Sequence, residues 1–240
     1  MDRTLSLNSP FGTHFGFAVA SGQEFCELER ILHWQELELI SPRAVASRRR
    51  EFFLGRAAAH AALAQLAPPA LPTQPILRGK HNEPLWPAGI VGAITHTEGI
   101  AIAAVAATTQ ANGIGIDLEA KQRQVSWDIT QRTCLPSELC WINAAPTTER
   151  LARFIMLFSA KESAFKAFFP IAEVFLDFTD VELSWDAAAG QFDGSLRKAA
   201  GISYPLGYRF KVGCQQSDGY VFTYLALPPV TTVATVAELE

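Results

Sequence analysis

Apolar and polar positions along the chain predict helices first and strands afterwards. Segment 23–40 mixes apolar and acidic residues without a breaker, which favours a helix, and a second helix is expected over 41–66. Ser41 followed by Pro42 is typical of a helix N-cap with proline at the first helical position. The pair Pro68-Pro69 is expected to end the second of these helices.

The middle of the chain predicts a β-hairpin. Residues 100–107 are apolar and strand-like, and Asn112-Gly113 is a common hairpin turn. Residues 114–119 would form the return strand, so we expect the two strands to be antiparallel neighbours.

The C-terminal part predicts two further helices and three strands, at 136–142, 149–169, 181–185, 208–212 and 220–227. Pro170 is expected to close the longer helix. The order of these elements indicates an α+β chain, with helices packed on antiparallel strands. The residues after Pro228-Pro229 read as a loose tail.

Composition and charge narrow the class of protein. The chain has 240 residues, 49% of them hydrophobic, and a net charge of −4, so bulk binding of nucleic acid is not expected. The cysteines lack CxxC spacing, which argues against a zinc site. The longest apolar run, 89–107, is interrupted by His96 and Glu98, and no signal peptide is recognisable. We therefore expect a cytoplasmic protein without a membrane span.

Two carboxylates share one side of a predicted strand. In the segment 113–119, Asp117 and Glu119 are two residues apart and point to the same face. Neighbouring carboxylates repel each other unless a cation lies between them, and Mg²⁺ prefers such oxygen ligands. A solvated strand face explains this pattern as well as a metal site does.

Charged residues also interrupt the apolar stripe of the helix at 149–169. At helical rotation Glu162 falls within the stripe formed by Leu151, Ile155, Phe158, Phe165 and Phe169, and Lys166 lies at its edge. Burying a charge in the core costs roughly several kcal/mol of stability unless the charge is paired or bound to metal. Glu162 therefore either pairs with Lys166 or lines a site, and the site is favoured.

A third charged group lies on the helix at 41–66. Arg56 falls in the stripe of Val45, Phe52 and Leu63, with Arg49 nearby. A buried arginine needs a bound anion or an acidic partner, and the acidic stretch 24–38 could supply one. Lys80 and His81 precede the next loop and could meet phosphate, although their spacing alone does not establish this. His96 precedes the strand at 100–107, and a lone histidine in such a place is more often structural than catalytic.

Four segments together resemble the phosphopantetheinyl transferases of the surfactin and enterobactin synthetase type, most closely the enterobactin branch. In this sequence they lie at 50–58, 83–96, 115–119 and 158–166, in the order of the family. The Asp-x-Glu pair alone is weak, whereas the KExxxK motif that follows it is much more specific. The family fold implies two similar α/β halves related by a pseudo-twofold axis, with the join near 112–113. We therefore expect an N-terminal half at 1–112, a C-terminal half with the metal site at 113–228 and a tail at 229–240.

The resemblance also implies an activity and roles for residues. The activity is transfer of phosphopantetheine from coenzyme A to a serine of an apo acyl or peptidyl carrier protein, with release of 3′,5′-ADP. The roles cover Mg²⁺ ligands (Asp117, Glu119, Glu162), catalysis (Glu162, Lys166, His96) and coenzyme A contacts (Arg49, Arg56, Lys80, Thr95, His96, Lys161, Lys166). We expect a monomer.

Two positions depart from the family pattern. Thr95 stands where serine usually precedes the histidine, and Asn82 stands where a basic residue is usual. The second change removes one expected phosphate contact and bears on coenzyme A affinity. Siderophore, other peptide synthetase, polyketide and fatty-acid carriers all remain open as partners.

Two other functions fit the sequence less well. A non-catalytic coenzyme A-binding protein on this fold would not need both Glu162 and Lys166. A magnesium-dependent phosphohydrolase would need more carboxylates around a two-metal site than the sequence offers.

Overall fold

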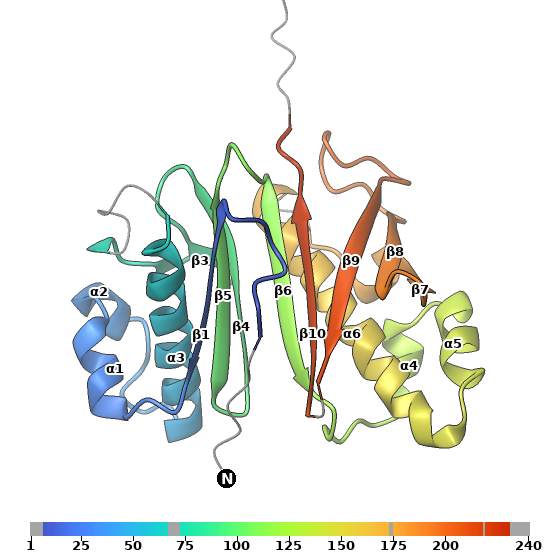
Figure 1. Ribbon diagram of the computed structural model, residues 1–240, viewed down its shortest axis with the longest axis horizontal. Coiled ribbons are helices and arrows are strands. Elements are labelled where there is room, and N and C mark those ends of the chain that lie inside the picture. The colour runs from blue at the N-terminus through green and yellow to red at the C-terminus, as the bar shows by residue number, and fades with distance from the viewer. Residues whose placement is uncertain (1–6, 67–72, 173–174, 218, 231–240) are drawn as a thin grey trace, which may run out of the picture.

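Two antiparallel sheets, each covered by one long helix, make up the chain (Figure 1). The computed structural model describes residues 7–66, 73–172, 175–217 and 219–230. The α+β class and the two α/β halves expected from the sequence are confirmed. In the part of the chain that is described, no helix is both long enough and apolar enough to cross a membrane.

The first sheet has the order β1-β5-β4 and carries helix α3 on its outer face. Short helices and a two-stranded ribbon flank it. The elements of this half are β1 (Phe15–Ser21), α1 (Phe25–Ile31), α2 (Trp34–Leu37), α3 (Ala46–Leu63), β2 (Leu77–Arg78), β3 (Pro84–Leu85), β4 (Ile90–Thr97) and β5 (Ile100–Ala107).

The second sheet has the order β6-β10-β9-β8-β7, and helix α6 packs on β6 and β10. The elements of this half are β6 (Gly113–Ala120), α4 (Asp128–Thr133), α5 (Pro136–Asn143), α6 (Thr147–Ala172), the 3-10 helix η2 (Phe178–Asp180), β7 (Val181–Asp186), β8 (Gln191–Leu196), β9 (Arg209–Gln216) and β10 (Tyr220–Leu227).

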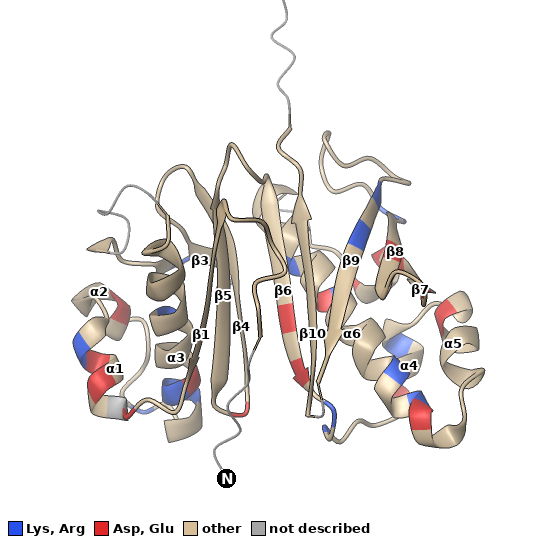
Figure 2. Cartoon of the chain, viewed as in Figure 1, with Lys and Arg blue, Asp and Glu red and all other residues tan. Residues whose placement is uncertain are grey.

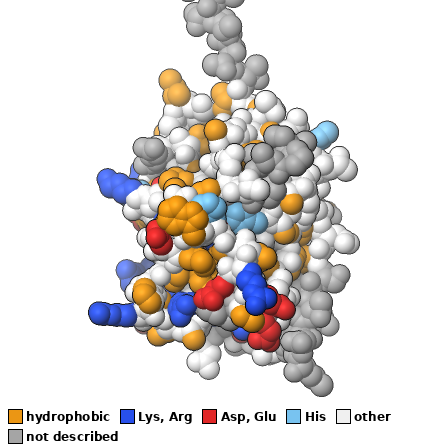
Figure 3. Space-filling view, turned by 90° about the vertical axis from the view of Figure 1, so that its left-hand side faces the viewer, with side chains coloured by type: hydrophobic (Ala, Val, Ile, Leu, Met, Phe, Trp, Pro, Cys, Tyr) orange, Lys and Arg blue, Asp and Glu red, His pale blue; other side chains and the backbone are white. Residues whose placement is uncertain are grey.

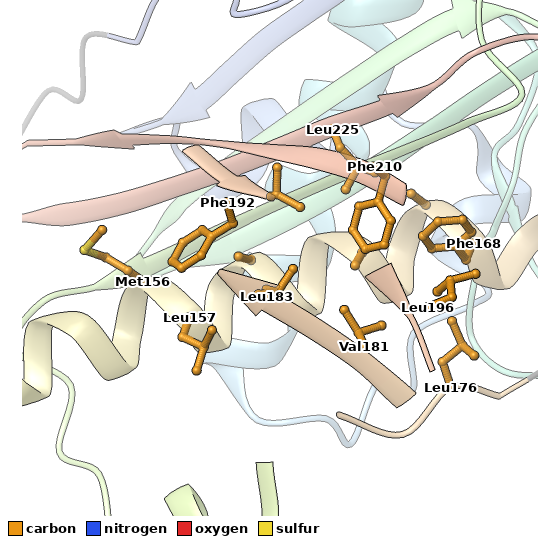
Figure 4. Close-up of a cluster of buried hydrophobic side chains, with 14 of the residues drawn as sticks. Met156, Leu157, Phe168, Leu176, Val181, Leu183, Phe192, Leu196, Phe210 and Leu225 are labelled. Carbon is orange, nitrogen blue, oxygen red and sulfur yellow. The ribbon is translucent and has the colours of Figure 1, made fainter. Parts of the chain in front are cut away.

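Three clusters of buried apolar side chains hold these layers together. One lies between α6 and the second sheet, where Leu157 and Phe168 meet Phe192 and Phe210 (Figure 4). A second lies between α3 and the first sheet. The third joins the sheets to each other and includes Ile116 and its neighbours on β1, β5 and β10. Burying one such side chain contributes about 1.5–3 kcal/mol, so the sheet-to-sheet cluster fixes how the two halves meet.

The predicted helix at 23–40 is wrong as a single element, because the chain forms α1 and α2 instead. His33 starts the second helix: its Nδ1 accepts a hydrogen bond from Gln35 N, and Glu36 accepts one from His33 N. This reciprocal capping favours a new helix start over continuation of the first.

The predicted start of the next helix is also wrong. Ser41 Oγ accepts a hydrogen bond from Arg43 N and Ser41 O accepts one from Ala44 N, so this segment is a turn. Helix α3 begins only at Ala46, and Val45 is its exposed N-cap rather than part of the buried stripe. The predicted stop at Pro68-Pro69 lies outside the described residues.

The predicted hairpin at Asn112-Gly113 is the largest error in topology. β5 pairs with β1 and β4, whereas β6 pairs with β10 in the other sheet. Asn112 donates its backbone N–H to Leu227 O and its side-chain amide to Tyr204, so it anchors the crossing between sheets. The hairpin in this region instead joins β4 to β5 through Glu98 and Gly99, both with positive φ.

Most of the remaining predicted elements are confirmed. Strand β5, the strand character of β6, helix α5 and strands β7, β9 and β10 lie where the sequence placed them, within a few residues. Pro170 lies inside the last turn of α6, which continues to Ala172. Strands β1, β4 and β8 were not predicted. The tail at 231–240 lies outside the described residues.

Glycines on β6 allow α6 to approach the sheet closely. A Cβ atom on Gly115 would lie 1.8 Å from Ser163 O, and one on Gly113 would lie 2.3 Å from Ala167 O. Such contacts are with helix backbone, which cannot move aside as a flexible side chain would. The Gly-x-Gly pair therefore sets the helix-to-sheet spacing, and with it the distance between the charged residues that follow on both elements.

We predict that Gly115→Ala destabilises the protein strongly, because the new methyl group forces α6 away from β6. Overpacking of this kind costs about 1–3 kcal/mol and sometimes more. Urea unfolding of the variant measures the loss. The matched control is Gly12→Ala, at an exposed glycine where an added Cβ meets nothing within 4 Å. Equal midpoints for the two variants would contradict the prediction.

Candidate functional site

Strand β6 presents its two carboxylates toward α6. Ile114, Ile116 and Leu118 enter the core between the sheets, so Asp117 and Glu119 lie on the opposite side, as the strand alternation predicts. Figure 2 shows the acidic stretch in the second half of β6.

Asp117 is buried at the meeting point of the two halves, with 5% of its surface exposed. Its Oδ1 accepts a hydrogen bond from Thr95 Oγ1 of β4 at 3.2 Å and one from Lys166 Nζ of α6 at 2.7 Å. Thr95 Oγ1 in turn accepts a hydrogen bond from Leu118 N at 3.1 Å. Within the described part of the chain, the buried Oδ2 has no hydrogen-bond partner. A buried carboxylate oxygen without a partner is costly, so it marks a position suited to a cation or donor.

Glu119 is held by Arg123, whose guanidinium lies 2.6 Å from Oε1. The same guanidinium lies 5.1 Å from the ring centroid of Phe158 on α6. Burial raises the pKa of Glu119, and the nearby charge of Asp117 raises it further, whereas Arg123 lowers it. The two carboxylates of β6 therefore repel each other, and Arg123 offsets part of that repulsion.

Helix α6 brings Glu162 and Lys166 to the same place. Lys166 Nζ donates to Asp117 Oδ1 and to Ile116 O, so its ion pair is with β6 rather than with Glu162. Glu162 lines a cavity of about 160 Å³ together with Phe165 and Phe178. Burial raises the pKa of Glu162, Lys166 lowers it, and Asp117 raises it. Of the two alternatives left open by the sequence, an ion pair between Glu162 and Lys166 is not what Lys166 forms, and Glu162 lines a cavity instead.

The apolar stripe assigned to α6 is only partly right. Ile155 and Phe169 are buried, but Phe158 and Phe165 are half-buried and face a cavity or an aromatic neighbour. The face that packs on the sheet runs instead through Leu157, Ala160, Ala164, Ala167 and Phe168. Glu162 thus lies on the flank of α6 that borders the cleft.

Lys161 lines the same small cavity as Glu162 but is buried beside Glu138 of α5. Its Nζ lies 2.6 Å from Glu138 Oε2 and donates to Thr133 O and Phe178 O. Glu138 also accepts hydrogen bonds from Leu135 N and Leu183 N. The sequence placed Lys161 among the coenzyme A contacts, whereas this geometry gives it a structural partner.

Arg56 is also paired inside the fold. Its Nε lies 3.9 Å from Glu36 Oε1, it donates to Leu77 O, and its guanidinium lies over Phe52. Burial lowers the pKa of Arg56 to about 10, and Glu36 opposes that shift. The acidic stretch 24–38 therefore supplies the partner that the sequence left as one of two alternatives.

A basic cavity of about 180 Å³ nevertheless adjoins Arg56. Arg48, Arg78 and His96 line it as well. Burial lowers the pKa of His96, and Glu51, whose Oε2 is 3.8 Å from Nδ1, raises it. The sequence did not single out Arg78, which belongs to the short strand β2 in a segment that the prolines indicated to be a loop. Arg49 pairs with Glu29 at 3.5 Å.

Lys80 lines a larger cavity, of about 520 Å³, that both halves enclose. His81 and Asn82 join it from the first half, and Phe165 and Lys166 join it from α6. Figure 3 shows the outer side of the first half, where hydrophobic side chains, charges and histidines are mixed. Lys166 of α6 therefore borders the hollow between the halves, Glu162 lines the smaller cavity, and Phe165 lines both.

The carboxylates do not form a ready-made metal cage. Among the described residues, no group of three or more His, Cys, Asp and Glu side chains is arranged to hold a metal ion. Asp117 and Glu119 are instead engaged by Lys166 and Arg123. The sequence did not identify Arg123, although its spacing of four residues from Glu119 is visible there.

Comparison with known proteins matches both halves to one family. Residues 35–106 match the model of the 4′-phosphopantetheinyl transferase N-terminal domain, and residues 113–224 match that of the 4′-phosphopantetheinyl transferase superfamily.

Individual relatives agree with these matches. The chain is 39% identical to 4′-phosphopantetheinyl transferase Svp of Streptomyces mobaraensis over 64% of its own length and 61% of that protein. It is 34% identical to 4′-phosphopantetheinyl transferase Npt of Nocardia iowensis, covering 67% of this chain and 69% of Npt. It is 31% identical to enterobactin synthase component D of Escherichia coli (strain K12), covering 69% of this chain and 76% of that protein. The match thus spans about three fifths of the length of Svp.

We predict that Lys161→Met destabilises the protein, because Glu138 would keep a buried charge without its cation. Breaking a buried ion pair in this way costs about 3–5 kcal/mol. Urea unfolding checks the value. The double variant Lys161→Met with Glu138→Leu should recover most of the loss, since neither charge remains. A double variant no more stable than the single one would contradict this account.

We also predict that Glu36 makes stability dependent on pH in the acid range. Burial alone would raise the pKa of Glu36, but hydrogen bonds from His60, Ile76 and His33 hold it below 4.5. Its contribution is therefore present above about pH 4.5 and lost as pH falls through the lower folded value. At pH 7, Glu36→Gln should cost about 1–3 kcal/mol in urea unfolding.

The difference between wild type and Glu36→Gln should narrow below pH 4.5. Glu27→Gln, at an exposed position of α1, serves as the control and should show little difference at any pH. A gap that stays constant between pH 7 and pH 3.5 would overturn the assignment to Glu36.

Proposed function

Because this chain belongs to the 4′-phosphopantetheinyl transferase superfamily, we propose that it transfers phosphopantetheine from coenzyme A to a serine of an apo acyl or peptidyl carrier protein. The serine oxygen attacks the β-phosphorus of coenzyme A, and the bond from that phosphorus to the bridging oxygen breaks. The products are the phosphopantetheinyl serine and 3′,5′-ADP, with the serine proton transferred to a base.

One observation carries this proposal: three carboxylates and a lysine from two elements act on one another through an ion pair and through their charges, and Glu162 and Lys166 each line a cavity. Asp117 and Glu119 come from β6, and Glu162 and Lys166 come from α6. Lys166 is bonded to Asp117, and the charge of Asp117 acts on both glutamates. Phosphoryl transfer depends mainly on positioning and charge neutralisation, which such a group can provide.

The donor set fits a magnesium ion. Asp117 Oδ2 is buried without a hydrogen-bond partner among the described residues, and the charge of Asp117 raises the pKa of Glu162. Asp117, Glu119 and Glu162 would hold the ion through hard oxygen ligands, leaving positions for pyrophosphate oxygens and water. When bound, Mg²⁺ would neutralise charge that develops on the pyrophosphate during transfer.

Two residues of α6 act on protons and charge in this scheme. Burial raises the pKa of Glu162, which makes its carboxylate a better acceptor for the serine proton, directly or through a water. Two of the three N–H groups of Lys166 donate hydrogen bonds to Asp117 Oδ1 and Ile116 O. The third remains to donate to the leaving pyrophosphate oxygen.

The coenzyme lies along the hollow between the halves in this proposal. Arg48 and Arg78 would face the 3′-phosphate in the smaller basic cavity, and the buried Arg56, which also lines it, would add its positive charge. His96 also lines this cavity and would donate a hydrogen bond to phosphate. Lys80 would meet the nucleotide in the larger cavity.

We further infer a division of the chain at residues 112 and 113, with the metal ligands in the second half. The passage of the chain from the first sheet to the second at Asn112 supports this division. We propose in addition that the protein is a monomer in the cytoplasm and that its partner is a siderophore or other secondary-metabolite carrier. The same proposal implies that the activity tolerates Thr95 at the position where serine is usual.

The decisive experiment is mass spectrometry of a panel of apo carrier proteins after incubation with the protein, coenzyme A and Mg²⁺. We predict that at least one carrier gains one phosphopantetheine group. Glu162→Gln should reduce the rate by about 10²–10⁴-fold, as expected for loss of a general base that also binds metal. Omitting Mg²⁺ should have a similar effect.

The matched control is Glu149→Gln, an exposed glutamate in the first turn of the same helix. It should leave the rate within a factor of about two, since surface substitutions are usually neutral. Folded protein that binds coenzyme A but modifies no carrier would instead favour a non-catalytic coenzyme A-binding protein.

A further inference from the structure

Arg123 occupies one of the carboxylates that the proposed metal site requires. It lies in the turn after β6, and its guanidinium is 2.6 Å from Glu119 Oε1. The side chain of Glu119 is only 14% exposed, whereas that of Arg123 is 45% exposed. The arginine therefore reaches inward from the surface to a largely buried acid.

Arg123 has a second contact, which does not involve Glu119. Its guanidinium lies over the ring of Phe158, which stacks on Phe178 at 5.2 Å between ring centroids. Contacts of this kind contribute about 0.5–1 kcal/mol at exposed sites, which is enough to keep the cation at the rim of the cleft.

The charges of the cleft explain why the arginine and a metal ion compete. Asp117, Glu119 and Glu162 are offset by the two cations Lys166 and Arg123. Lys166 binds the most buried acid from the rigid helix α6, whereas Arg123 comes from a turn. A divalent cation beside Glu119 would be repelled by the guanidinium and would need the oxygen that Arg123 now holds.

We propose that Arg123 is an internal counter-cation of Glu119 that must release this carboxylate before a divalent cation can bind, so that Arg123 sets the affinity of the site for metal. The inference rests on the proposed magnesium-dependent function. It also accounts for the arrangement of the described residues. Asp117 and Glu119 form ion pairs with Lys166 and Arg123, and the acids are not grouped around a single metal position.

The test is a titration with Mn²⁺, followed by electron paramagnetic resonance of the free ion, with coenzyme A present. We expect Arg123→Gln to bind Mn²⁺ about threefold to tenfold more tightly than the wild type, because it removes both the competing ion pair and the repulsion. Arg123→Lys keeps the positive charge and should stay closer to the wild type. In the transfer assay, Arg123→Gln should reach half-maximal rate at a correspondingly lower Mg²⁺ concentration.

The matched control is Arg197→Gln, which removes an exposed arginine whose partner, Glu182, is 3.2 Å away in the same half. Its Kd for Mn²⁺ should equal that of the wild type, and a shift like that of Arg123→Gln would reduce the effect to net charge and overturn the proposal. An unchanged or weaker Kd for Arg123→Gln, with wild type that does bind Mn²⁺, would overturn this inference alone. A wild type that binds no Mn²⁺ would overturn it together with the magnesium requirement of the proposed function.

Discussion

The carboxylate of Asp117 is the group on which the rest of the structure depends. It is buried where the two halves meet, and a charge in that position is tolerated only with compensating partners. Thr95 supplies one from the first sheet, and Lys166 supplies the other from the helix that covers the second. One oxygen remains without a partner among the described residues. A bound cation would therefore lower the free energy cost of burying this carboxylate.

Lys166 reaches Asp117 because β6 and α6 lie close together. Gly113 and Gly115 provide the closeness, since any side chain there would collide with the backbone of α6. The alternating positions, Ile114, Ile116 and Leu118, anchor the same strand in the core between the sheets. One short segment thus sets both the contact between the halves and the spacing of the charged cleft.

Several charged residues near the cleft form buried ion pairs that stabilise the fold. Glu36 binds Arg56 and His60, and Glu138 binds Lys161, in both cases with little or no exposure to water. Buried pairs of this kind contribute little net stability but become costly when one partner is lost. They fix α3 and α6, the helices that carry the residues bordering the two basic or charged cavities.

The sequence by itself determined the α+β class, the long helices, the alternation that puts Asp117 and Glu119 on one face, and the motifs that identify the family, because these depend on local periodicity and spacing. Only the tertiary structure decided that Asn112-Gly113 joins two sheets instead of forming a hairpin, since strand pairing depends on distant partners such as β10. It also decided which cation meets which acid. Lys166 pairs with Asp117, Lys161 with Glu138 and Arg123 with Glu119, and the first two of these pairs join residues that are far apart in the sequence. Helical spacing shows which side of α6 a lysine lies on, but the acid that it meets there depends on which strand or helix packs against that side.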